Sequence, residues 1–281
     1  MGYAEILVQT GVKPADVARM SLAADLAQRF GGGLTGAFVT PPPIVAGFQA
    51  GADFGSGAVG STVAQLLQDQ SVEVARDSAQ AEEAFRKAAS AGGLRSAFLS
   101  VSGAGPAALT ALARRADLTV LPSASDSPGA GPDAPADHVA MSAGGPVLIV
   151  NPEWASGKVG SRILIAWNGS REAGRAVRDA MPFLKTAEKV DVLVVGHEEA
   201  ASGAEDAVPA YLAKHGCKAS VLRVATVDQP IGEVLLRNAA RLECDLIVMG
   251  LYGHTRLQET VLGGASRDVL RHSRTPLLVS H

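Results

Sequence analysis

Glycine residues are spaced through the stretch from Met249 to Ser266 in a way that suits anion binding. They stand at positions 250, 253, 263 and 264, after the apolar run Leu246–Met249 and before a helix predicted to begin near Ala265. Glycine adopts positive φ at low cost and lets a ligand approach the backbone closely. Free N–H groups of the loop and of the helix start can then converge on a negative charge. The stretch therefore predicts a phosphate-binding loop.

Motifs that would indicate fast catalysis or a metal centre are missing from the sequence. There is no HExxH or paired Cys/His spacing, no GxSxG turn, and no Walker A ending in Gly-Lys-Ser/Thr. The glycine stretch holds His254 and Arg256, either of which could touch a phosphate or a partner, but it holds no lysine. A transferred phosphoryl group would lack that cation, so we expect at most slow phosphoryl transfer and no catalytic residue or metal.

Composition excludes several classes of protein. The chain has 281 residues, of which 47% are hydrophobic and only 4% aromatic, a balance typical of helices packed on a buried parallel sheet. A formal charge of −3 without a Lys/Arg cluster argues against nucleic acid as a partner. No apolar run is long enough to span a membrane, and no signal peptide is evident. Cys217 and Cys244 lack CxxC spacing and read as core residues, so we expect a cytoplasmic location.

Strand and helix patterns alternate through the second half of the chain. Apolar β-type runs alternate with amphipathic or capped segments. The predicted strands are 162–167, 189–195, 219–224, 245–249 and 276–280. The predicted helices are 171–187 with a possible kink at Pro182, 204–215, one opened by Pro230 at its first position, and one beginning near Ala265.

The first half repeats this order less clearly. Its predicted strands are 6–9, 34–39, 94–101, 118–121 and 146–150, and its predicted helices are 16–30, 62–90, 106–115 and 137–143. Such alternation implies parallel sheets with right-handed crossovers. We therefore expect two tandem α/β domains, residues 1–151 and 159–281, joined by the short segment 152–158.

The second half closely resembles the universal stress protein family. The match is the pattern G-x2-G-x9-G, filled by Gly250, Gly253 and Gly263, with the turn Asn168-Gly-Ser170 and the Pro-Leu-Leu-Val ending in support. The resemblance implies a tandem member with two open, parallel, doubly wound five-stranded sheets in the order 3-2-1-4-5, with helices on both faces. In the family, fifth strands pair across a dimer interface. Here this implies either a homodimer or an intramolecular pseudo-dimer in which 147–150 pairs with 277–280.

The resemblance also implies a nucleotide site, at the carboxyl ends of strands one and four of the second half. Its ligand would be ATP, with or without Mg²⁺, or another adenine nucleotide. Carried over by position, the base and ribose would be bordered by Ala166, Trp167, Asn168, Val195, Met249 and Gly250. The phosphates would be wrapped by Gly253, Gly263, Gly264, Ala265 and Ser266.

Departures from the family pattern leave more than one function open. Family members that bind ATP commonly carry Asp where Asn168 stands and Ser or Thr where Gly264 stands. The first half lacks the glycine spacing altogether, so we predict no nucleotide site of this type there. The leading hypothesis is a nucleotide-binding regulatory stress protein. The alternatives are a slow ATPase or phosphoryl-transfer enzyme assisted by Ser266 or His254, and an interaction scaffold without nucleotide.

The apolar Gly/Pro-rich segment 41–57 is longer than most connections, and such segments are often functional. Its Phe48 and Phe54 either pack on their own domain, which we favour, or meet a partner.

Overall fold

Strands and helices alternate in both halves of the chain. The structure is a computed structural model, and it describes residues 2–40, 57–90, 93–102, 105–123, 135–154, 157–196, 207–225, 229–252 and 264–281. The elements of the first half are β1 (Glu5–Gln9), α1 (Pro14–Phe30), β2 (Gly33–Thr40), α2 (Gly57–Ala89), β3 (Ser96–Ser102), α3 (Gly105–Ala113), β4 (Leu118–Pro122), α4 (Pro135–Ser142) and β5 (Val147–Val150).

In its described residues, the second half repeats the order with one additional short helix. Its elements are β6 (Arg162–Trp167), α5 (Arg171–Asp179), α6 (Met181–Leu184), β7 (Lys189–Val195), α7 (Ala207–Lys214), β8 (Ser220–Val224), α8 (Ile231–Arg241), β9 (Leu246–Gly250), α10 (Gly264–His272) and β10 (Leu277–Ser280). The predicted segment 152–158 falls between β5 and β6. The division into domains 1–151 and 159–281 stays a prediction.

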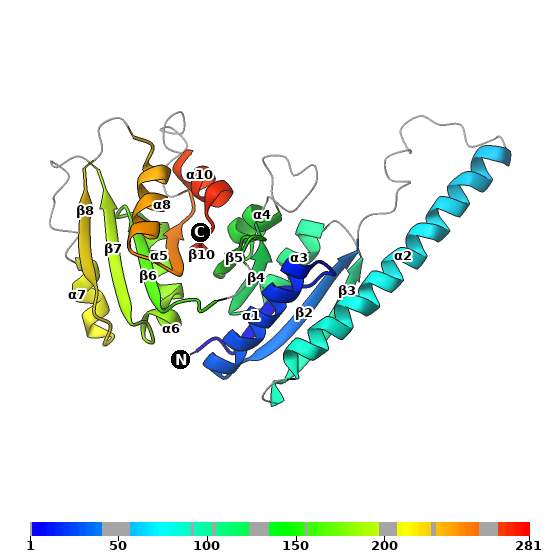
Figure 1. Ribbon diagram of the computed structural model, residues 1–281, viewed down its shortest axis with the longest axis horizontal. Helices are drawn as coiled ribbons and strands as arrows, with labels where there is room; N and C mark the ends of the chain where they lie inside the picture. The colour runs from blue at the N-terminus through cyan, green and yellow to red at the C-terminus, as the bar shows by residue number, and fades with distance from the viewer. Residues whose placement is uncertain are drawn as a thin grey trace.

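Within the described residues, the strands form one ten-stranded sheet in the order β3-β2-β1-β4-β5-β10-β9-β6-β7-β8. Each half has the expected order 3-2-1-4-5 with parallel pairing, so the predicted fold class is confirmed. The two halves are not separate sheets, however, because β5 and β10 pair antiparallel, Leu277 opposite Ile149 and Val279 opposite Val147 (Figure 1). Of the two arrangements expected for the fifth strands, the structure shows the intramolecular one. The pairing covers the β5 edge of one half-sheet and the β10 edge of the other, and leaves β3 and β8 as the edges of the joined sheet.

Both faces of the sheet are apolar and covered by helices. Successive side chains of a strand point to opposite faces, and in β6 Ile163 and Ile165 pack on one face while Leu164 packs on the other. The first face is covered by α1, α2, α5, α6 and α7. The second is covered by α3, α4, α8 and α10. A sheet buried on both sides needs near-continuous apolar strands, which the sequence supplies.

An aromatic cluster joins the two halves on the first face. The ring of Phe30, at the end of α1, lies 5.1 Å from that of Tyr3 and 5.0 Å from that of Phe183 in α6. The Tyr3 hydroxyl donates to the Asp179 carbonyl at 2.7 Å, and burial raises the pKa of this phenol well above its ordinary value. Gly160 has φ +84° and faces Phe183 so closely that a side chain there would collide with the ring. The halves therefore share one core across the joint.

Among the helix boundaries that differ from the predicted ones, two lie at or near prolines. The helix expected over 171–187 is divided into α5 and α6, and the break falls at Ala180, two residues before Pro182. Proline disfavours helical backbone in the residue before it and lacks the N–H for a hydrogen bond. Pro230 is the cap residue of α8 and not its first helical residue, because its ψ is 130°.

Cys217 and Cys244 are free and buried, as the sequence predicts. None of the described helices combines the length and the apolar character needed to cross a bilayer. The segment 41–56, with Phe48 and Phe54, lies outside the described residues.

Candidate functional site

The candidate site lies where β6 and β9 end side by side. The two strands are parallel neighbours with Ala166 opposite Met249. The chain leaves β6 toward α5 on the first face, and it reaches α10 on the second face after β9. Adjacent strands whose connections diverge to opposite faces open a crevice at their carboxyl ends, which is where open α/β sheets bind ligands.

Three of the predicted residues share the second face of the sheet at this edge. Ala166 of β6, Val195 of β7 and Met249 of β9 all pack toward the core beneath α8 and α10. Met249 is 6% exposed, whereas Ala166 and Val195 are half-buried. The structure thus brings together an apolar surface on three neighbouring strands. A planar apolar group could lie against such a surface.

Two other predicted residues face α5 instead. Trp167 packs with the first-face core, near Gly174 of α5. A Cβ atom added to Gly250 would lie 2.5 Å from the backbone nitrogen of Ala173 and 2.5 Å from the carbonyl carbon of Glu172. Backbone atoms cannot yield to such a contact, so α5 can pack on β9 only because residue 250 has no side chain. This packing gives a structural reason for a glycine that the family pattern assigns to the ligand.

Asn168 and Ser170 form the turn that starts α5. The Asn168 Oδ1 accepts the N–H of Ser170 at 3.1 Å, and the Ser170 Oγ accepts the N–H of Ala173 at 3.1 Å. Gly169 between them has φ +76°, a left-handed conformation that favours glycine. The predicted turn and helix cap are therefore present. Asn168 is exposed, but its side-chain oxygen already serves the turn.

The first turn of α5 contains a negatively charged side chain, that of Glu172. Glu172 is 7% exposed and bonds Arg171, with 2.7 Å between its Oε1 and the Arg171 Nη2. Burial alone would raise the pKa of Glu172, but its own backbone N–H, Arg171 and the charge of His281 together hold that pKa below its usual value. An ionised carboxylate there interacts favourably with the helix dipole. A phosphate is thus better accommodated at α10 than at α5.

The N-terminus of α10 has few neighbours among the described residues. Gly264 begins the helix and is exposed, and of the described atoms a Cβ atom there would meet only Asp268 Oδ2, at 3.9 Å. Ala265 and Ser266 are half-buried in the first turn, where unpaired backbone N–H groups can receive an anion. Gly253 and Gly263, like His254 and Arg256, lie outside the described residues. Their part in a phosphate cradle stays a prediction.

The exit from β9 contains groups that sequence reasoning missed. The N–H of Leu251 donates to the Ser280 carbonyl at 2.9 Å, and the Leu251 carbonyl lies 3.0 Å from His281 Nδ1. Tyr252 follows with φ +52°, which is uncommon outside glycine and marks a position worth testing for function. Burial, reinforced by Asp137 of α4, raises the pKa of the Tyr252 phenol. Neither Tyr252 nor Glu172 belongs to a spacing pattern, so no sequence signal singled them out.

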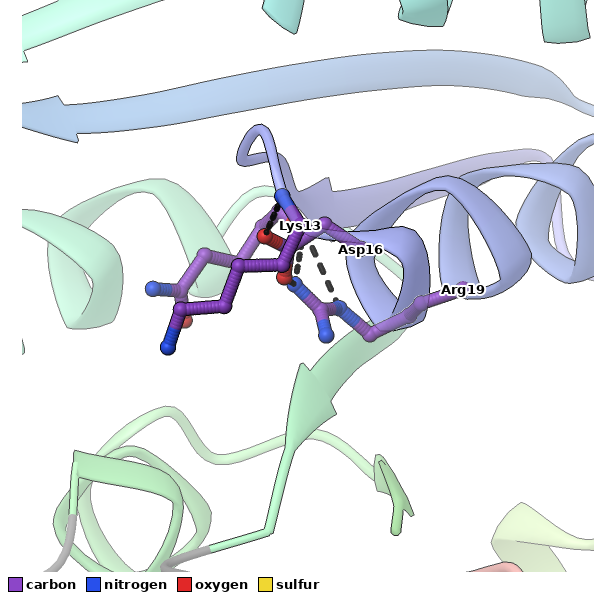
Figure 2. A network of polar contacts seen from close by, with 4 residues as sticks. Lys13, Asp16 and Arg19 are labelled. Carbon is purple, nitrogen blue, oxygen red and sulfur yellow. Dashed lines mark hydrogen bonds and ion pairs between the residues drawn. The ribbon is translucent and has the colours of Figure 1, made fainter. Parts of the chain in front are cut away.

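The corresponding edge of the first half is built differently. Arg19 of α1 is 2% exposed and donates from Nε and Nη2 to the carbonyl of Gln9, the last residue of β1, at 3.2 and 3.0 Å. Its Nη2 also bonds Asp16 Oδ1 at 2.6 Å, and the other oxygen of Asp16 accepts the Lys13 N–H at 3.0 Å (Figure 2). A buried ion pair thus holds the end of β1, where the second half has the Asn168 turn.

The described residues contain no cluster of His, Cys, Asp or Glu side chains able to hold a metal ion.

Comparison with known proteins identifies the second half. Residues 161–281 match the sequence model of the Universal stress protein family. A comparison with curated proteins finds no significant match.

Solved structures share the fold over nearly the whole chain. A universal stress protein from Archaeoglobus fulgidus DSM 4304 is 15% identical with a TM-score of 0.68, over 98% of this chain and 95% of that one. A putative universal stress protein from Pseudomonas aeruginosa UCBPP-PA14 has a TM-score of 0.59 at 15% identity, over 99% and 93% of the two chains. A functionally unknown protein from Pseudomonas aeruginosa PAO1 has a TM-score of 0.57 at 15% identity, over 99% and 92%. At these identities the likeness concerns the fold.

Proposed function

We propose, from the match of residues 161–281 to the Universal stress protein family, that the C-terminal half binds one adenine nucleotide and that ATP is the preferred ligand. Binding would switch the conformation or the association of a cytoplasmic regulatory protein. The observation that carries the proposal is that β6 and β9 end side by side while their connections lead to opposite faces of the sheet, the place where open α/β sheets bind ligands.

Each part of the nucleotide has a group suited to it in this arrangement. The base would lie against the apolar surface of Ala166, Val195 and Met249. The ribose would reach Asn168 and the backbone of Trp167 and Gly250. The phosphates would meet the N–H groups of Gly264 and Ala265 with the Ser266 hydroxyl, together with Gly253 and Gly263 of the preceding stretch. Mg²⁺, when present, would be held by the phosphates, as is usual for this ion.

Two features favour binding over turnover. The stretch 250–266 contains no lysine to stabilise a transferred phosphoryl group. The carboxylate in the first turn of α5, Glu172, is held by Arg171 and is mostly buried, which suits it poorly to activate water. Any hydrolysis would therefore be slow.

Substitutions at Gly264 test the proposal with little effect on packing, because among the described residues a Cβ atom there would meet only Asp268 Oδ2, at the ordinary contact distance of 3.9 Å. Gly264→Asp places a negative charge at the phosphate position, yet an acidic residue in the first turn favours the helix. Calorimetry with ATP should show binding to the native protein and a loss of affinity of about tenfold or more in Gly264→Asp, since like charges in contact repel by more than 1.4 kcal/mol at low effective dielectric.

The opposite change at the same position is the control. Gly264→Ser supplies a hydroxyl donor and should bind ATP at least as tightly as the native protein. Equal affinity of both variants would exclude α10 as the phosphate site. If native protein gives neither heat with ATP nor a rise in melting temperature, the interaction scaffold becomes the better interpretation, because a ligand that binds the folded state must stabilise it.

A further inference from the structure

Helix α2 is much longer than the part of the sheet that it covers. Its 33 residues span about 50 Å, whereas the eight residues of β2 span about 26 Å. The helix contacts α1, β2 and β3, and its N-terminal part extends beyond the sheet (Figure 1). Most of the stability of a helix in a protein comes from packing of its apolar face. A helix segment that extends beyond the sheet lacks such packing, so its amphipathic face is suited to contact a partner.

The burial of α2 changes along its length. In the C-terminal part, Ala81, Phe85 and Ala89 are buried against the first-face core. Between positions 63 and 80, a range whose side chains the structure describes, no residue is buried. The same helical side continues there as a half-buried stripe through Val63, Leu67, Gln70, Val74 and Asp77. The stripe thus continues beyond the part of α2 that is packed on the core, and it remains largely apolar there.

A groove of about 460 Å³ lies along this part of the helix. Its lining residues are Phe38 of β2 and Leu66, Asp69, Gln70, Glu73, Val74 and Asp77 of α2. Phe38 is 8% exposed and closes the groove toward the sheet, while Leu66 is 45% exposed at its outer side. Val72, on the same segment, is 64% exposed. Large apolar side chains therefore remain accessible within and beside the groove.

The groove is acidic as well as apolar. Asp69, Glu73 and Asp77 follow one another at four-residue spacing, which places them on one side of the helix. Gln65 donates to Asp69 at 2.9 Å, and Arg76, itself 72% exposed, lies 3.4 Å from Asp77. Glu73 has no ion-pair partner within the part of the chain that the structure describes. Negative charge at the groove is thus only partly compensated.

We infer that this groove docks a basic amphipathic helix of a partner protein, with apolar side chains in the groove and Lys or Arg side chains on Asp69, Glu73 and Asp77. Helix-in-groove recognition uses an apolar face for affinity, and complementary charge at the rim sets orientation and rejects wrong partners. A second copy of this chain fits less well, because two acidic grooves would repel one another. This inference is independent of the nucleotide site.

A synthetic amphipathic helix of about 18 leucine and lysine residues is a suitable probe, since that length gives five turns with one apolar face. Labelled with a fluorophore, it should bind the native chain saturably and more weakly as salt rises. Glu73→Lys should raise its Kd by about tenfold or more, because reversal replaces an attraction with a repulsion. Leu66→Ala should weaken binding without altering the salt dependence.

Glu83→Lys is the matched control. Glu83 is an exposed residue of α2 outside the groove, so this variant changes the net charge equally and should bind the probe as the native chain does. Equal effects of the two reversals would reduce the binding to nonspecific attraction and overturn the inference. So would an absence of binding to the native chain, or equal binding of a leucine–glutamate helix. Self-association of the native chain that Glu73→Lys abolishes would identify a second copy as the occupant instead.

Discussion

Individual side chains at the start of α5 have separate structural tasks. Ser170 caps the helix, Glu172 places a negative charge at its positive end, and the side-chain oxygen of Asn168 accepts a hydrogen bond within the turn. The sequence predicted the turn and the cap, because Asn, Gly and Ser each have a local backbone role there. It could not predict the burial of Glu172, which depends on β9 and β10 packing beside α5.

Asn168→Asp is expected to strengthen nucleotide binding. A carboxylate can keep the Ser170 N–H bond with one oxygen and offer the other to the ribose, and hydrogen bonds to a charged acceptor exceed neutral ones by about 1 kcal/mol, or about fivefold in Kd. Calorimetric titration with ATP measures the change, and Asn168→Ala, which removes the turn, is the comparison. An affinity for ATP that Asn168→Asp leaves unchanged or lowers would show that residue 168 does not contact the ribose.

At the scale of elements, the glycines of the motif serve different purposes. Gly250 lets α5 approach β9, whereas a Cβ atom at Gly264, the start of α10, would make no close contact with the described residues. The sequence alone cannot separate these roles, because Gly250 meets Glu172 and Ala173, which lie far from it along the chain. The order of strands and helices was predictable from apolar runs and capping residues, but the ends at Ala180 and Pro230 were not, since they depend on local ψ angles.

Alanine substitutions at the two glycines should separate packing from binding. Gly250→Ala forces a methyl group against the α5 backbone and should lower the free energy of unfolding by about 1–3 kcal/mol, the usual cost of overpacking. Gly264→Ala has room and should leave that free energy unchanged or raise it by about 0.5–1 kcal/mol, because alanine favours helix. Urea denaturation followed by circular dichroism measures both. Equal stabilities would contradict the packing role of Gly250.

At the scale of the whole molecule, two half-sheets become one through β5, β10 and the aromatic cluster. Pairing of the fifth strands was foreseeable because 146–150 and 276–280 are near copies in pattern. The cluster was not foreseeable, since Tyr3, Phe30 and Phe183 are far apart in sequence and meet only when the sheets join. A shared core couples the halves energetically, so a change at one can reach the other.

Phe183→Ala tests this coupling directly. Phe183 is fully buried between the halves, so its truncation should cost about 3–5 kcal/mol of unfolding free energy. The two tryptophans, Trp154 in the joint and Trp167 in β6, report on the joint and the second half, whereas circular dichroism reports on both halves. The two signals should change together in the native chain and separate in Phe183→Ala, because the second half then unfolds independently.

Phe85→Ala removes an equally buried ring within the first half and leaves the joint intact, so its signals should remain coincident. Signals that stay coincident in Phe183→Ala would show that β5–β10 pairing alone holds the halves together.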